Sequence, residues 1–239
     1  MIQERYVEYE HDGKLLEGFL AYDDAMDVEK PGVIVAPAWA GRSNFECDKA
    51  RKLATQGYVG FACDLYGKGV LGKSTEENSG LMKPFIDDRK KLQSCLSKIL
   101  ETLQTQTQTE VDEESIAAIG YCFGGLCVLD LARIDAKVKG VVSLHGLFGA
   151  PGNTQGTKIT AKVLALHGHE DPMVPVEAVM DLQNELTAAG ADWQIHVYGG
   201  TMHAFTNPMA NDPSFGTVYN ANADKRSWQS VLNFLEEIF

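Results

Sequence analysis

The sequence lacks long apolar runs and has no excess of positive charge. No stretch approaches the ~20 consecutive apolar residues of a transmembrane helix, and residues 1–5 do not resemble the start of a signal peptide. The formal net charge is −12, which argues against nucleic acids and anionic membrane surfaces as partners. We therefore expect a cytoplasmic protein that acts on a small molecule.

Cysteine pairs and metal-ligand spacings are also missing. The cysteines are odd in number and none forms a C-x-x-C pair: Cys47, Cys63, Cys95, Cys122 and Cys127. Three of them lie in apolar or helical surroundings, which is typical of reduced core residues. His167 and His169 alternate on opposite faces of an extended segment, so they do not form a ligand set for zinc. The pattern predicts a reducing compartment and no metal site.

Linkers and internal repeats are absent, and predicted strands and helices alternate along the whole chain. Residues 5–21 are expected to form a β-hairpin, because apolar and polar residues alternate on both sides of a turn. Further strands are expected as apolar runs, typical of a parallel sheet buried on both faces, at 33–36, 58–63, 115–120, 138–144 and 162–168, with a more exposed strand at 193–198.

Helical patterns separate these strands, at 43–56, 81–103, 124–134, 176–189 and 224–238, and loops are expected at 23–32, 68–80 and 105–109. This order predicts a single domain over residues 1–239. Its fold class is α/β, with a doubly wound, mostly parallel sheet that starts with an antiparallel hairpin.

The segment Gly120-Tyr121-Cys122-Phe123-Gly124-Gly125 joins a predicted strand directly to a predicted helix. Glycines on both sides of Cys122 allow a sharp turn, as in the nucleophile elbow of hydrolases, with cysteine where serine is usual. A helix N-terminus at this place favours the thiolate form of the cysteine. The alternative interpretation is a buried cysteine beside a glycine-rich turn, as found in many parallel α/β folds.

A nucleophilic thiol needs a base, and the base needs an acid that orients it. Asp171 and His203 follow Cys122 in the chain order of α/β-hydrolases, and both come directly after predicted strands. Asp171 could instead cap a helix or stabilise the turn before Pro172, and His203 could be a surface-loop histidine. His145 also follows a strand, and we expect it either to line the pocket or to be a hydrogen-bonded buried histidine.

An oxyanion hole requires two backbone N–H groups. Phe123 follows the nucleophile and supplies one, and Trp39, in the loop after the strand at 33–36, is expected to supply the other. Trp39, Phe123 and Phe205 would give the pocket apolar walls, unless they simply pack in the core. Because a thiolate leaves a tetrahedral intermediate far more readily than an amide nitrogen does, a cysteine nucleophile favours esters with good leaving groups over amides.

Several motifs together resemble the dienelactone hydrolase (carboxymethylenebutenolidase-like) family: Gly120-Tyr121-Cys122-Phe123-Gly124-Gly125, Asp64-Leu65-Tyr66-Gly67, His167-Gly168 with Asp171-Pro172 and Val174-Pro175, and His203-Ala204-Phe205. The resemblance covers nearly the whole chain. It implies a three-layer α/β-hydrolase fold without a large cap domain, a triad of Cys122, Asp171 and His203, and no cofactor. It also implies that the substrate pocket is lined by Ala38, Tyr66, His145, Phe205 and Asn207.

The substrate-recognition residues of that family are not matched. The founding enzymes carry a glutamate at the place of Ala38 and an arginine at the place of Asn207, and a second arginine would fall within 74–78, where this sequence has none. We therefore expect a hydrolase of activated esters or lactones that works through an acyl-enzyme on Cys122, with dienelactone itself disfavoured as the substrate. The alternatives are a thioesterase or acyltransferase, and a non-hydrolytic protein that binds a small ligand on the same scaffold. The oligomeric state, monomer or dimer, stays open.

Overall fold

The structure is a computed structural model that describes residues 1–25, 29–106 and 111–239. These residues form two compact units, Met1–Ile119 and Gly120–Phe239. The boundary between the units falls within strand β5 (Val111–Tyr121). The single domain expected over residues 1–239 stays a prediction, and each unit is described by itself.

The first unit begins with the expected antiparallel hairpin. Strands β1 (Ile2–His11) and β2 (Lys14–Asp23) pair along their full length, and the turn between them uses positive φ angles at Asp12 (53°) and Gly13 (69°). The strand order in this unit is β1-β2-β4-β3-β5. Strand β2 is antiparallel to β4 (Val59–Ala62), and β4 is parallel to β3 (Lys30–Ala36). The prediction of an antiparallel start is therefore confirmed.

Some boundaries in this unit differ from the prediction. Strand β3 begins at Lys30, inside the segment predicted as a loop, while residues 26–28 of that segment lie outside the described residues. Helix α1 (Asn44–Ala54) is capped by Ser43, the residue at which the helix was predicted to start, and Ser43 forms a capping box with Glu46. This helix packs on β2, β3 and β4, and α3 contacts β1 and β3.

The prediction of a loop at 68–80 and one helix at 81–103 was wrong. Two helices occupy this region, α2 (Thr75–Asp87) and α3 (Arg89–Gln104). The side chain of Ser74 accepts a hydrogen bond from the N–H of Glu77 and so starts α2 early. Asp88 has non-helical backbone angles, and its carboxylate accepts from the N–H of Lys91, so α3 starts anew there. Of the predicted connector at 105–109, residues 107–109 lie outside the described residues.

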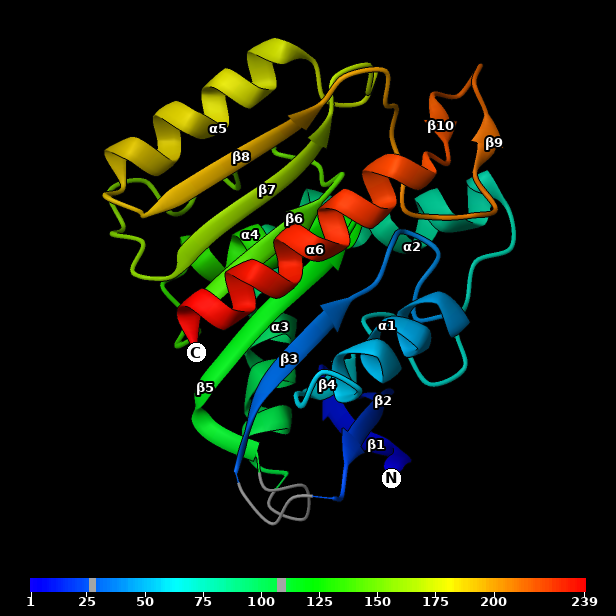
Figure 1. Cartoon of the computed structure of the whole chain (residues 1–239), viewed down its shortest axis with the longest axis vertical. Coiled ribbons are helices and arrows are strands. Elements are labelled where there is room, and N and C mark those ends of the chain that lie inside the picture. Colours follow the sequence, from blue (N-terminus) through cyan, green and yellow to red (C-terminus); the bar gives the residue numbers. More distant parts are fainter. Residues whose placement is uncertain (26–28, 107–110) are drawn as a thin grey trace. The chain divides into compact units, whose positions relative to one another are not determined.

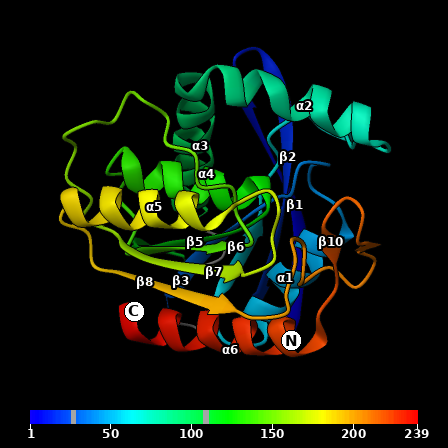
Figure 2. The ribbon, with the colours of Figure 1, turned by 90° about the horizontal axis from the view of Figure 1, so that it is seen from above.

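The second unit contains three parallel strands, β6 (Gly140–Leu144), β7 (Lys162–Gly168) and β8 (Trp193–Tyr198), in that spatial order (Figure 1). Helices α4 (Phe123–Arg133) and α5 (Val176–Ala188) cover one face of these strands, and α6 (Ala221–Ile238) covers the other (Figure 2). A short hairpin of β9 (Asn211–Asp212) and β10 (Thr217–Val218), which the sequence did not predict, lies between β8 and α6 in the chain.

The α/β class and the mostly parallel sheet are confirmed. The apolar runs of β6 and β7 are buried because helices cover them on both sides, as expected for parallel strands. Among the described helices, none is both long enough and apolar enough to cross a bilayer. The loops after β6, β7 and β8 carry His145, Asp171 and His203, which is where open α/β sheets place their sites.

Candidate active site

Cys122 occupies a strained turn between β5 and α4. Its backbone angles are φ 55° and ψ −114°, which non-glycine residues rarely adopt and which a fold retains only when its surroundings enforce them. A Cβ at Gly120 would lie 2.0 Å from the carbonyl oxygen of Gly124, and one at Gly125 would lie 2.5 Å from the Cα of Gly146. Both positions therefore require glycine. The turn leaves Cys122 partly exposed, while Tyr121 and Phe123 are buried.

Asp171 and His203 form a buried pair. The Nδ1 atom of His203 lies 2.7 Å from Oδ2 of Asp171, and both side chains are almost fully shielded from solvent. The second carboxylate oxygen, Oδ1, accepts a hydrogen bond from the backbone N–H of Met173 at 2.8 Å. Asp171 therefore stabilises its own turn and also holds one ring nitrogen of His203, while its role as the acid of a triad stays a prediction.

The hairpin that the sequence did not predict holds the backbone of His203. The N–H of His203 donates to the carbonyl of Gly216 at 3.0 Å, and the N–H of Val218 donates to the carbonyl of His203 at 3.1 Å. No helix or strand directly precedes His203, so these two hydrogen bonds are what hold the backbone of its loop in place. The placement of the imidazole thus depends on β10 as well as on Asp171.

The imidazole of His203 is electrostatically coupled to Cys122. Burial by itself lowers the pKa of His203, but the charge of Cys122 and the hydrogen bond with Asp171 outweigh it and raise the pKa to about 10. The Nε2 atom is buried and has no hydrogen-bond partner of standard geometry among the described residues. Cys122 is therefore close enough to stabilise the imidazolium, although its Sγ does not complete a well-aligned hydrogen bond.

His145 is buried and hydrogen-bonded on both ring nitrogens. Its Nδ1 atom accepts from the backbone N–H of Cys122 at 3.2 Å, and its Nε2 atom lies 2.8 Å from Oγ1 of Thr206. The ring also packs edge-on against the rings of His203 and Phe205, with centroids 5.2 and 5.0 Å apart. The sequence offered two interpretations for this residue, and the structure supports the buried, hydrogen-bonded histidine. The contribution of Thr206 had no signal in the sequence.

The other predicted pocket residues of the second unit differ in exposure. Phe205 is fully buried and packs against His145 and Tyr198, whereas Asn207 is partly exposed and its Oδ1 accepts from the N–H of Met209. Phe123, the first residue of α4, is fully buried. Core packing therefore explains both phenylalanine side chains.

The predicted residues of the first unit lie around the loop after β3. The hydroxyl of Tyr66 donates to the carbonyl of Trp39 at 3.0 Å, and the N–H of Ala38 donates to Oε1 of Glu46 at 3.2 Å. Trp39 and Ala38 are partly exposed, and Tyr66 is buried. Burial raises the pKa of Glu46, which was not among the predicted site residues although its capping-box spacing after Ser43 is visible in the sequence. Glu46 and Tyr66 together order the loop that carries Trp39.

The motif Asp64-Leu65-Tyr66-Gly67 has a structural explanation. The buried carboxylate of Asp64 accepts hydrogen bonds from the N–H groups of Glu17, Tyr66 and Gly67 at 2.9–3.1 Å. It thereby closes the turn after β4 and fixes Tyr66 against Trp39.

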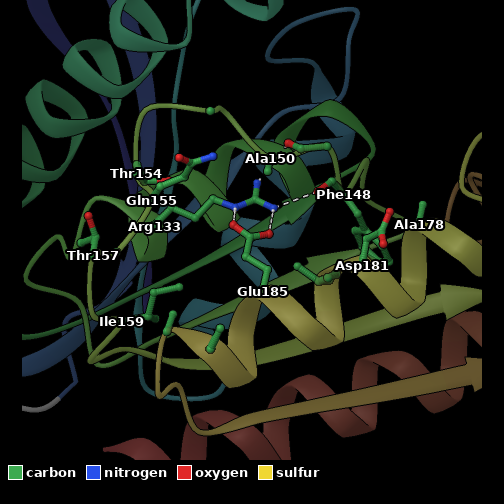
Figure 3. A pocket seen from close by; sticks show the side chains of 16 residues that line it. Arg133, Phe148, Ala150, Thr154, Gln155, Thr157, Ile159, Ala178, Asp181 and Glu185 are labelled. Carbon is green, nitrogen blue, oxygen red and sulfur yellow. Dashed lines mark hydrogen bonds and ion pairs between the residues drawn. The ribbon is translucent and has the colours of Figure 1, made fainter.

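A cavity of about 510 Å³ in the second unit lies between α5 and the segment 148–159, and its lining does not include Cys122, Asp171 or His203 (Figure 3). Arg133 forms part of its wall, but all five of its N–H donors are engaged by protein groups: the carboxylates of Glu185 and Asp130 and the carbonyls of Phe148 and Gly149. This guanidinium is therefore a structural tie. Within the described residues there is no cluster of histidine, cysteine and carboxylate side chains that would hold a metal ion.

The sequence profile of the dienelactone hydrolase family matches residues 16–239. The chain belongs to this family. It is 32% identical to a solved structure named m3DLH, with a TM-score of 0.92 over 100% of this chain and 99% of that one. It is also 32% identical to the dienelactone hydrolase-like promiscuous phosphotriesterase P91 from metagenomic libraries, with a TM-score of 0.93 and the same coverage.

A carboxymethylenebutenolidase-like protein of Aquifex aeolicus (strain VF5) is 26% identical over 244 residues, covering 96% of each chain. Membership of the dienelactone hydrolase family confirms two predictions, the α/β-hydrolase fold class and the identification of the chain as a hydrolase. Other solved structures with this fold, at 12–15% identity, include esterases from Thermogutta terrifontis.

Proposed function

We propose that this member of the dienelactone hydrolase family is a cysteine-dependent hydrolase that forms an acyl-enzyme on Cys122. The observation that carries the proposal is the state of His203. One ring nitrogen is fixed by Asp171, the other is buried without a hydrogen bond of standard geometry, and Cys122 and Asp171 together raise the pKa of the ring to about 10 against the opposing effect of burial. This is the arrangement of a base that exchanges a proton with a nucleophile and a leaving group.

In the proposed reaction the thiolate of Cys122 attacks the carbonyl carbon of an ester or lactone, forming a C–S bond. As the tetrahedral intermediate collapses, the bond to the leaving oxygen breaks and the imidazolium of His203 gives that oxygen its Nε2 proton. Water then attacks the thioester while neutral His203 takes one of its protons. The C–S bond breaks, the carboxylic acid is released, and the thiolate and imidazolium are restored. Asp171 keeps Nδ1 protonated throughout.

The oxyanion is proposed to bind to two backbone N–H groups, those of Phe123 and Trp39. Phe123 is the first residue of α4, so its N–H belongs to the helix N-terminus, where negative charge is stabilised. Trp39 stands in the loop after β3 that Tyr66 and Glu46 order. Of the predicted wall residues, the partly exposed Ala38 and Asn207 would contact substrate. The buried ones would support the wall: Tyr66, His145 and Phe205.

The proposed substrates are esters and lactones with stabilised leaving groups. A thiolate is itself a good leaving group, so only substrates whose oxygen departs at least as readily go forward rather than revert. Ala38 and Asn207 stand where the founding enzymes carry a glutamate and an arginine, which argues against an anionic dienelactone. Thioesters, with transfer to water or to another acceptor, are the alternative within the same chemistry.

A second candidate activity is the hydrolysis of aryl phosphotriesters. It is favoured by the 32% identity and the TM-score of 0.93 to P91, which is described as a promiscuous phosphotriesterase. The same thiolate would attack phosphorus to form a P–S bond while the imidazolium protonates the departing aryl oxide, and water activated by neutral His203 would then break the P–S bond and restore the thiolate. We also propose a reducing, cytoplasmic location, because the five cysteines, all within the described residues, form no disulfide and the mechanism needs one of their thiols.

The proposal is tested by the mass of the intact protein during turnover of four probes: an aryl acetate, an enol lactone, a thioester and an aryl phosphotriester. The wild type should gain and then lose the mass of one acyl group, or of one phosphoryl group with the phosphotriester, and Cys122→Ala should gain none. Release of the leaving group by the mutant at the wild-type rate would contradict the mechanism. If no probe gives a Cys122-dependent adduct or turnover, the hydrolytic mechanism is wrong, and binding of a small ligand on the same scaffold becomes the better interpretation.

A further inference from the structure

His145 connects the two halves of the proposed catalytic pair. One ring atom, Nδ1, accepts a hydrogen bond from the backbone N–H of the nucleophile Cys122 at 3.2 Å. The same ring packs against the imidazole of His203, with the centroids 5.2 Å apart and the planes at 65°. Through this hydrogen bond and this ring contact, the side chain of His145 touches both the proposed nucleophile, Cys122, and its proposed base, His203. Cys122 and His203 lie on turns that follow different strands, so such a link bears directly on their separation.

The backbone at these residues is strained, which makes the link necessary. Cys122, His145 and Ala204 all have positive φ angles, of 55°, 37° and 56°. Each such residue costs about 1–3 kcal/mol and persists only where neighbouring groups enforce it. The N–H of Cys122 is held by two acceptors, the carbonyl of Leu144 at 3.1 Å and Nδ1 of His145 at 3.2 Å. Both acceptors come from the end of β6.

The hydrogen bonds also define the tautomer of His145. Because Nδ1 accepts from a backbone N–H, it carries no proton, and the proton of the neutral ring must lie on Nε2. Nε2 is 2.8 Å from Oγ1 of Thr206, which accepts that proton. Thr206 is buried, so no water competes for this bond. A neutral ring also avoids placing a second positive charge against the imidazolium of His203.

We propose that His145 is a positioning residue that sets the distance between the thiol of Cys122 and Nε2 of His203, and that Thr206 holds it in the tautomer this requires. The proposal rests on the proposed function, since it concerns the same thiol and base. It adds a residue that acts on the reaction without touching the substrate. The effect should therefore fall on kcat and on thiol reactivity, and KM should change little.

Two variants of similar shape test the hydrogen bond, and the thermal unfolding of each reports the extra backbone strain that the positive φ imposes on Leu. Asn places Oδ1 two bonds from Cβ, as histidine places Nδ1, and it tolerates a positive φ. Leu has a similar branched shape without an acceptor. His145→Leu should lower the rate of acylation about 100-fold, the effect expected of a catalytic group displaced by about 1 Å. His145→Asn should retain most of the activity, because the N–H of Cys122 keeps its acceptor.

Thr206→Val is a second probe that leaves His145 and its backbone in place. Val has the shape of Thr without the hydroxyl, so Nε2 of His145 loses this acceptor and the ring is free to place its proton on Nδ1. In that tautomer the N–H at Nδ1 faces the backbone N–H of Cys122, so the hydrogen bond between them is lost and the two donors repel each other. We expect a loss of about fivefold in kcat, the equivalent of one neutral hydrogen bond. His196→Phe, on β8 and outside this network, is the control and should keep wild-type activity.

The measurements are single-turnover acylation by an aryl acetate, alkylation of Cys122 by iodoacetamide across pH, and thermal unfolding of each variant. We expect the wild type to acylate fastest, His145→Asn to be slower and His145→Leu to be slowest, with KM within about threefold. Alkylation near neutral pH should fall in the same order. Equal losses in His145→Asn and His145→Leu would overturn the proposal, since only packing would then matter, and so would a change confined to KM.

The test distinguishes this proposal from the proposed function. If wild-type protein acylates and the His145 and Thr206 variants match it, only the positioning role is wrong. If wild-type protein never acylates, the alkylation profiles still report whether His145 controls the thiol. If His145→Leu does not fold, the Thr206→Val variant decides. The proposal is then overturned if Thr206→Val is acylated and alkylated at the same rates as the wild type.

Discussion

Two buried cationic side chains of the second unit, Arg133 and His203, are satisfied to very different degrees. Every N–H of Arg133 donates to a protein acceptor, with Glu185 bound through two hydrogen bonds of 2.8 Å. His203 has one nitrogen bonded to Asp171, and its Nε2 is buried without a hydrogen bond of good geometry. A fold stabilises a structural charge by completing its hydrogen bonds. The incomplete hydrogen bonding of His203 is what the proposed function requires, because there its Nε2 proton has to move.

The two ends of α4 show the same division of roles. Cys122 precedes the first residue of the helix, and Arg133 is its last residue. The N-terminal end of a helix stabilises negative charge and the C-terminal end stabilises positive charge. Cys122 thus stands at the end of the helix that stabilises negative charge, and Arg133 stands at the end that stabilises positive charge. Cys122 is partly exposed and Arg133 is buried, so of the two side chains only Cys122 is accessible from solvent.

The largest expected effect comes from breaking the orientation of His203 with Asp171→Asn. The amide presents an N–H toward Nδ1 in one orientation and a weaker acceptor in the other, so the imidazole no longer has one enforced tautomer. We expect kcat for the aryl acetate to fall about 10⁴-fold, as for the corresponding change in other triads. Stopped-flow or steady-state hydrolysis measures it, with circular dichroism as the control for folding. A loss below about tenfold would show that Asp171 only stabilises its turn.

Removing the other buried cation, the guanidinium of Arg133, should lower the stability of the fold and leave the rate of acylation nearly unchanged. Arg133→Met removes the cationic partner of the fully buried Asp130 and the guanidinium donors to the carbonyls of Phe148 and Gly149. We expect the free energy of unfolding to fall by about 3–5 kcal/mol, measured by urea titration. Acylation of Cys122 should stay within about threefold of wild type at a temperature where the variant is folded. A large loss of activity in folded protein would mean that Arg133 is not purely structural.

Much of the site could be predicted because long apolar strands fix where the chain turns. The bounds of β7 and β8 agree with the prediction. Asp171 and His203 lie in the loops after these two strands, as the prediction required. Glycine spacing around Cys122 likewise predicts a sharp turn, since only close backbone contacts require Gly120 and Gly125. These features are local, so a single sequence contains them.

The remaining features depend on contacts that no local pattern encodes. The bond between the N–H of Cys122 and Nδ1 of His145 forms because the end of β6 meets the elbow, and neither segment shows this alone. The hairpin that holds His203 has strands of only two residues, too short for a periodic pattern. The break before α3 was predictable in principle, because Asp88 is a capping residue. An apolar helical pattern on both sides of it outweighed that signal.

A smaller effect tests the coupling of His203 to the thiol. In Cys122→Ala the negative charge that favours the imidazolium is gone, while burial still favours the neutral ring. The pKa of His203 should therefore fall from about 10, and the ring should lose its proton at lower pH than in the wild type. An NMR titration of the imidazole nitrogens measures this, with histidines outside the site as internal references. An unchanged titration of His203 would show that Asp171 alone sustains its charge.

The smallest effect is expected from an exposed ion pair, which serves as the reference for Arg133. Lys98 and Glu101 lie one turn apart on α3, with Nζ and Oε2 separated by 3.1 Å and both side chains substantially exposed. Water solvates both charges when the pair is broken, so Lys98→Ala should change the free energy of unfolding by no more than about 0.5 kcal/mol. The same urea titration measures it beside Arg133→Met. If Lys98→Ala and Arg133→Met lowered the free energy of unfolding equally, the complete hydrogen bonding of buried Arg133 would contribute no more than an exposed ion pair. The contrast between Arg133 and His203 would then have no physical basis.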